Sequence, residues 1–230
     1  MAEHIGIVAC SAEGAALCYR TICGEAAHFM GEHGHPEITM HTHPLSEYMV
    51  HIRSGDWAGV AELMLSSCRK VASVGARFAV CPDNTIHEAF ERVVERSPIP
   101  WLHIARVVAR EAKRRGYARL GILGTRYLME GPVYPGALGP EGIASEVPGE
   151  EDRERINTII FKELVNGVFR EGSRQYFNEV MERLRARGAD AVVLGCTEIP
   201  LIVRPAEAPL PTLDSTRLLA RAALERALQS

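Results

Sequence analysis

The sequence lacks the marks of several large protein classes. It has no CxxC pair among its six cysteines, no Gly-rich phosphate signature of the GxGxxG or GxxxxGKS type, and no apolar run near the roughly 18 residues of a membrane span. Positive charge is not in excess, because 26 Lys and Arg stand against 29 Asp and Glu and the formal net charge is -3. We therefore expect no nucleotide-binding loop, no membrane span and no surface for nucleic acid.

The beginning of the sequence shows no basic segment followed by an apolar stretch, so we expect no secretory signal. Six scattered cysteines in such a chain are more typical of reduced thiols than of disulfides, and we predict a cytoplasmic protein. The 230 residues, 47% of them hydrophobic, are enough for one large domain or two small ones.

Short apolar runs alternate with longer amphipathic stretches along the whole chain. Strands are expected at 5–9, 37–41, 77–81, 120–123, 191–194 and 210–213, and helices after residue 12 and at 56–74, 104–115, 152–187 and 215–228, with a loop-rich segment at 131–151. This alternation is typical of parallel sheets covered on both faces. We predict an α/β fold of two pseudo-symmetric domains that face each other, 1–99 completed by 213–230, and 100–212.

Two turns carry the polar residues that matter most. One reads Val80-Cys81-Pro82-Asp83-Asn84-Thr85 and the other Leu194-Gly195-Cys196-Thr197-Glu198, each directly after a buried strand. In parallel sheets ligands bind at the carboxyl ends of strands, where helix N–H groups suit a carboxylate. Cys196 should therefore lie at a strand-to-helix turn that favours its thiolate, although a free cysteine is also a common buried hydrophobe.

Six short sequence motifs, in order along the chain, resemble those of one known family. Asn84-Thr85-Ile86-His87 and Gly195-Cys196-Thr197-Glu198-Ile199-Pro200 resemble the two signatures of the aspartate/glutamate racemases. Further similar pieces are Trp101-Leu102-His103-Ile104-Ala105, 123–130, Ile156-Asn157 with Glu163-Leu164, and Leu213-Asp214-Ser215-Thr216. The resemblance covers essentially the whole chain and implies two α/β domains with an active site in the cleft.

The resemblance also implies a function: a racemase or epimerase that needs no pyridoxal phosphate, other cofactor or metal and acts on an amino acid. One residue removes the α-proton while another delivers a proton to the opposite face, and hydrogen-bond donors stabilise the carbanion through its carboxylate. By resemblance Cys196 is one acid/base, Asn84, Thr85, Thr197 and Glu198 lie at the substrate, and Ser11 is a weaker candidate. The family-level expectation for the assembly is a homodimer.

This chain departs from the family pattern at two places. The family's first thiol stands directly before Asn-Thr, and here that position holds Asp83, which either replaces the thiol as acid/base or only caps the next helix. Cys81, two residues earlier, is an alternative second thiol. Ile52 falls where some relatives for acidic substrates carry a polar residue, so the substrate can be a less acidic amino acid or another α-substituted carboxylate.

Other readings stay open at this point. A one-cysteine decarboxylase, an isomerase of the same superfamily, or an amino-acid-binding protein without activity would share the fold. Several histidines crowd into residues 28–51, but no carboxylate or cysteine stands at a confirming spacing, and we expect no metal there.

Overall fold

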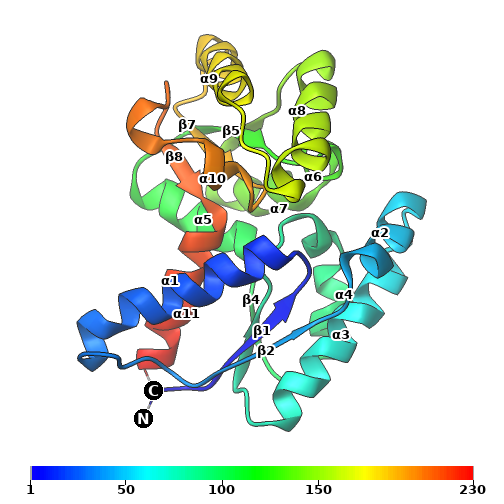
Figure 1. The fold of residues 1–230 in the computed structure, drawn as a ribbon, viewed down its shortest axis with the longest axis vertical. Helices are drawn as coiled ribbons and strands as arrows, with labels where there is room; N and C mark the ends of the chain where they lie inside the picture. The colour runs from blue at the N-terminus through cyan, green and yellow to red at the C-terminus, as the bar shows by residue number, and fades with distance from the viewer. Residues whose placement is uncertain (1, 230) are drawn as a thin grey trace. The chain divides into compact units, whose positions relative to one another are not determined.

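The computed structural model describes residues 2–229, which form two compact units (Figure 1). The first unit holds the residues up to Val107 and those from Thr216 onward, and the second holds Val108–Ser215. The unit boundaries lie a few residues beyond those predicted from the sequence. One reason is that β4 (Trp101–Leu102) pairs with the first sheet.

Among the described residues, the strands form two four-stranded parallel sheets, which confirms the predicted α/β fold. The first sheet has the order β2-β1-β3-β4, with β1 (Ile5–Ala9), β2 (Ile38–Thr42), β3 (Phe78–Val80) and β4. The second has the order β6-β5-β7-β8, with β5 (Arg119–Leu123), β6 (Ala144–Glu146), β7 (Ala191–Leu194) and β8 (Thr212–Asp214).

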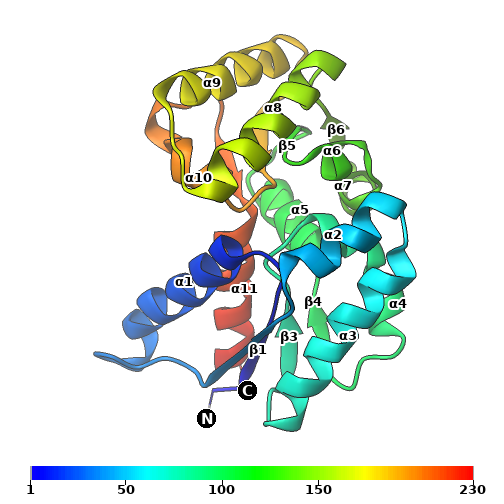
Figure 2. The ribbon, with the colours of Figure 1, turned by 45° about the vertical axis from the view of Figure 1, so that its right-hand side comes forward.

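Helices cover both faces of the first sheet (Figure 2). They are α1 (Ala12–Met30), α2 (Leu45–Ser54), α3 (Trp57–Ser73), η1 (Thr85–Ala89), α4 (Phe90–Val94) and most of α11 (Ser215–Leu228). α1 and α11 lie on one side, joined by an ion pair of 2.8 Å between Glu25 and Arg221, while α3 and α4 lie on the other. All five residues of β1 are buried, as expected for a strand covered on both faces.

The second unit has its own core. Its helices are α5 (Ile104–Arg114, which begins in the first unit), α6 (Arg126–Glu130), α7 (Val133–Leu138), η2 (Gly139–Glu141), α8 (Glu150–Lys162), η3 (Leu164–Asn166), α9 (Glu171–Ala186), α10 (Ile199–Ile202) and η4 (Pro205–Glu207). Ile160 of α8 and Phe177 of α9 pack with Val192 and Leu194 of β7, and all four are buried. α8 and α9 therefore cover the same face of this sheet.

The two sheets share their register as well as their strand order. Ile7 of β1 lies opposite Val80 of β3, and Ile122 of β5 lies opposite Val193 of β7. When Ile7 is matched to Ile122, every pairing of β1 with β3 and of β3 with β4 matches one of the second sheet, as do two of the five pairings of β1 with β2. The units are therefore internal copies at the level of the backbone.

A glycine at the same place in each central strand supports this equivalence. A Cβ on Gly6 would lie 2.7 Å from Val71 of α3, and one on Gly121 would lie 2.9 Å from Leu184 of α9. α3 and α9 are the helices that precede the equivalent strands β3 and β7. In both units the helix packs so closely on the central strand that only glycine fits.

The sequence prediction was wrong in three segments. The helix expected over 152–187 is broken after Lys162 by η3 and by Gly167, whose φ of 70° ends the helical path. The segment 131–151 contains α7 and β6 rather than loop alone. The strand expected at 210–213 lies at Thr212–Asp214, because its register is set by pairing with β7.

Candidate active-site residues

The turn after β7 brings Cys196 to the carboxyl end of the second sheet. The Gly195 N–H donates to the Leu123 carbonyl across 2.7 Å, so the chain crosses directly over the end of β5. A Cβ on Gly195 would lie 2.6 Å from Leu128, which explains why glycine precedes the cysteine. Cys196 is 8% exposed, and its thiol is therefore largely screened from water.

Glu198 holds the Cys196 thiol in place. Its Oε2 accepts hydrogen bonds from Cys196 Sγ and from Thr197 Oγ1, each across 2.9 Å. Only 3% of Glu198 is exposed. Only a thiol, and not a thiolate, can donate this hydrogen bond. The hydrogen of the Cys196 thiol is therefore directed at Glu198.

Cys196 lies at a strand-to-helix turn, between β7 and α10, as predicted from the sequence. The helix that follows Cys196, α10, has only four residues, so its dipole contributes little to the thiol. The contact of the thiol that the structure shows is its hydrogen bond to the Glu198 carboxylate.

The turn after β3 places Asp83, Asn84 and Thr85 at the carboxyl end of the first sheet. Asp83 Oδ1 accepts the Ile86 N–H across 3.2 Å, which is the helix-capping interaction considered from the sequence. Asp83 and Thr85 are half-buried, whereas Asn84 is 2% exposed. A backbone N–H directed at a carboxylate favours its ionised form.

Asp83 and Cys196 occupy equivalent positions of the two units. Each stands three residues after a matched strand residue, Val80 or Val193. By the same register Cys81 matches Leu194, a core residue at the strand end. Cys81 is fully buried, and burial together with the nearby Asp83 charge raises the pKa of its thiol well above the ordinary value.

His87 lies close to the Asp83 turn, and the sequence alone indicated no role for it. Its Nδ1 lies 2.6 Å from the Asp83 carbonyl, and its Nε2 accepts the Ile104 N–H across 3.3 Å. Burial lowers the pKa of His87 to about 4, so the ring is neutral at physiological pH. Its signal in the sequence is that His87 follows Asp83 by four residues. That spacing indicates a hydrogen bond only when the conformation of the turn is known.

Two other predicted residues belong to the first unit. Ser11 is the N-cap of α1, and its hydroxyl oxygen accepts the Gly14 N–H across 3.3 Å. Ile52 lies on α2 and is 5% exposed, packed in the core of this unit. Ser11 follows β1, the neighbour of β3, so it shares a sheet edge with the Asp83 turn.

The histidines at 28–51 make protein contacts. His41 Nδ1 bonds Ser67 Oγ and its Nε2 bonds Lys70 Nζ, both at 2.9 Å. No group of three or more potential metal ligands occurs among residues 2–229. In the same part of the chain, no helix has the length and apolar character needed to span a bilayer.

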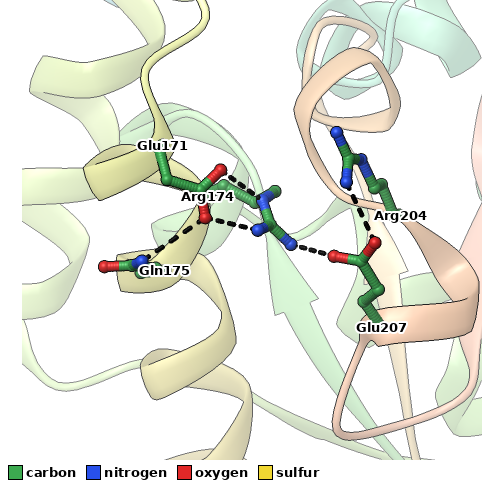
Figure 3. A network of polar contacts seen from close by, with 5 residues as sticks. All are labelled: Glu171, Arg174, Gln175, Arg204 and Glu207. Carbon is green, nitrogen blue, oxygen red and sulfur yellow. Dashed lines mark hydrogen bonds and ion pairs between the residues drawn. The ribbon is translucent and has the colours of Figure 1, made fainter.

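Ion pairs anchor the segment that follows α10 (Figure 3). Arg174 of α9 bonds Glu171 on its own helix and Glu207 in η4, and Arg204 Nη1 reaches Glu207 at 3.0 Å. The Arg174 side chain is 18% exposed, so solvent screens this network less than a surface pair. The network ties the chain beyond the Cys196 turn to α9.

A family model described as Asp/Glu/Hydantoin racemase matches residues 7–223. The chain belongs to the Asp/Glu/Hydantoin racemase family. The match spans both units and includes the turns that hold Asp83 and Cys196.

Solved structures of the racemase family match the whole chain. The crystal structure of a putative Asp/Glu racemase from Yersinia pestis has a TM-score of 0.90 and 33% identity, covering 99% of this chain and 100% of that one. An aspartate racemase homologue from Pyrococcus horikoshii OT3 has a TM-score of 0.85 and 25% identity over 99% and 100%. The broad specificity amino-acid racemase RacX of Bacillus subtilis is 20% identical over 152 residues, 66% of this chain and 65% of that protein.

Proposed function

We propose that this protein is a cofactor-independent amino-acid racemase or epimerase in which Cys196 and Asp83 form the acid/base pair on the two faces of the substrate α-carbon. Membership of the Asp/Glu/Hydantoin racemase family supports the reaction class. The observation that carries the residue assignment is the register of the two sheets, which puts Asp83 where the second unit has Cys196.

The resting protonation states fit such a pair. The Ile86 N–H at 3.2 Å favours an ionised Asp83, and the Glu198 carboxylate at 2.9 Å favours a protonated Cys196. Asp83 then removes the α-proton and Cys196 delivers its own to the opposite face. The reverse direction needs the opposite states, with a Cys196 thiolate and a protonated Asp83.

Carbanion formation requires donors directed at the substrate carboxylate, because the α-proton of an amino acid is very weakly acidic. Asn84 and Thr85 flank Asp83, and Thr197 flanks Cys196, so each acid/base has polar neighbours on its own turn. We propose these residues as the carboxylate-binding groups, with Ser11 at the neighbouring strand end. The substrate is an amino acid or another α-substituted carboxylate.

The test is exchange of the α-proton in deuterium oxide, followed by proton NMR for the L and D forms of each proteinogenic amino acid singly. The proposal expects exchange and loss of optical rotation for at least one pair, without change in carbon skeleton. Release of carbon dioxide from an aminomalonate or an arylmalonate in place of exchange identifies a decarboxylase. Thermal stabilisation by an amino acid without exchange identifies a binding protein.

A further inference from the structure

The two equivalent turns hold their backbones by different hydrogen bonds. In the second unit the Ile199 N–H donates to the Cys196 carbonyl across 3.0 Å. In the first unit the equivalent donor, the Ile86 N–H, is directed instead at the Asp83 side chain. The Asp83 carbonyl has a side-chain partner in this turn.

The His87 ring supplies that partner. Its Nδ1 lies 2.6 Å from the Asp83 carbonyl oxygen, and because this oxygen can only accept, Nδ1 carries the hydrogen. Its Nε2 accepts the Ile104 N–H, which can only donate, so Nε2 carries none. The two contacts together fix the neutral tautomer of His87 that carries its hydrogen on Nδ1.

The surroundings keep the ring from moving. His87 is 3% exposed and stacks on Phe90 with an interplanar angle of 13° and a centroid distance of 5.5 Å. His103 packs on it at 4.7 Å, and its Nδ1 in turn accepts the Ala105 and Arg106 N–H groups at the start of α5. The turn after β3 is thus fastened to the helix that follows β4.

We propose that His87 is a positioning residue for Asp83: its Nδ1–H holds the Asp83 carbonyl and so fixes the direction in which the Asp83 carboxylate leaves the turn. This inference rests on the proposed function, because it assigns the role of His87 through Asp83. His87 touches no reacting atom. Its loss should therefore impair only the proton transfer that Asp83 performs.

Two variants of the full-length chain separate the hydrogen bond from packing. His87→Asn keeps an N–H donor near the Nδ1 place, whereas His87→Phe keeps a ring to stack on Phe90 and has no donor. Both are compared with Asp83→Asn and Cys196→Ser for α-proton exchange in deuterium oxide. The probes are the L and D forms of the proteinogenic amino acid that wild type exchanges fastest, and Asp83→Asn identifies the enantiomer that depends on Asp83.

His87→Phe should slow exchange of the Asp83-dependent enantiomer about 100-fold, the cost of a displacement near 1 Å, and leave the Cys196-dependent enantiomer close to wild type. His87→Asn should restore the lost rate. An equal loss from both enantiomers, or no loss from either, overturns the inference. So does a His87→Asn variant as slow as His87→Phe.

A second measurement needs no substrate. Hydrogen exchange of the Ile86 amide should be at least about tenfold faster in His87→Phe than in wild type, because the turn opens when the carbonyl is released, and unchanged in His87→Asn. Unchanged Ile86 exchange in His87→Phe overturns the inference. If wild type exchanges no amino acid while Ile86 behaves as expected, the proposed function fails and the hydrogen-bond role of His87 stands.

Discussion

Glu198 Oε2 lies 2.9 Å from Cys196 Sγ, and both groups are almost fully buried. The thiol donates a hydrogen bond to this carboxylate oxygen, which a thiolate could not do. From the sequence we predict Glu198 as a substrate-binding residue, and its hydrogen bond with Sγ adds a second candidate role, through Cys196. We propose that Glu198, two residues after the cysteine, controls the ionisation of that thiol.

Glu198→Gln tests this relationship. The amide can still accept a hydrogen bond but has no charge, so the Cys196 thiolate becomes more populated at neutral pH. We expect alkylation of Cys196 by iodoacetamide to be about tenfold faster or more, measured by mass spectrometry of the Cys196 peptide. Cys68, buried and remote from Glu198 in the sequence, is the control thiol in the same digest. A slower or unchanged rate contradicts the role given to Glu198.

Cys196→Ser tests the thiol itself. Serine nearly matches cysteine in size but is far less acidic, so racemisation should fall at least about 100-fold while the fold is kept. The check is turnover by polarimetry together with circular dichroism of the folded variant. Unchanged turnover would return Cys196 to the class of buried hydrophobes.

His87 gives the first unit a pH-dependent stability. Its pKa falls from 6.5 to about 4 on folding, chiefly through burial and with a contribution from the Arg106 charge. The unfolded chain therefore binds a proton more readily, and stability should decline as the pH falls from about 6.5 to 4. The loss from this group is on the order of 3 kcal/mol.

The measurement follows unfolding by urea at several pH values. Both tryptophans, Trp57 and Trp101, lie in the first unit, so intrinsic fluorescence reports on the unit that holds His87. His87→Asn, which cannot titrate in this range, should lose less stability than wild type between pH 6.5 and 4. His103, whose burial lowers its pKa to about 2, accounts for part of the slope that remains. Equal slopes in the two proteins would mean that His87 does not titrate on unfolding.

Much of this fold was predictable because hydrophobic periodicity is local. Strand 191–194 and helix 215–228 were predicted at their observed bounds, and α3 within a residue at each end. The break near Gly167 was not predictable in the same way, since apolar residues on both sides continue the helical pattern. The candidate site residues also differ in how far the local sequence indicates them. Cys196 and Asp83 could be proposed from their turns, but the hydrogen bonds of Glu198 and His87 depend on how each turn is folded.

Asp83→Asn tests the second acid/base. Asn keeps an oxygen to accept the Ile86 N–H, so the turn should survive, but it is not a base. Racemisation should collapse in both directions, because each turnover needs one group on each face. Exchange from the enantiomer that Cys196 deprotonates should persist in deuterium oxide. Normal racemisation would leave Asp83 as a helix cap and direct attention to Cys81.

Asp83→Cys places a thiol at the position that matches Cys196. A thiol is a weaker acceptor than a carboxylate, so the Ile86 N–H is free to bond the carbonyl of residue 83, as the Ile199 N–H bonds that of Cys196. We expect exchange from both enantiomers, in contrast to Asp83→Asn, because a proton-transfer group again stands at this position. The rates of the two variants, measured on the same amino acid, decide whether residue 83 reaches the α-carbon. If Asp83→Cys folds but is as inactive as Asp83→Asn, residue 83 does not reach the α-carbon. If Asp83→Cys racemises an amino acid and wild type racemises none, the natural protein is a decarboxylase, an isomerase or a binding protein on a racemase fold.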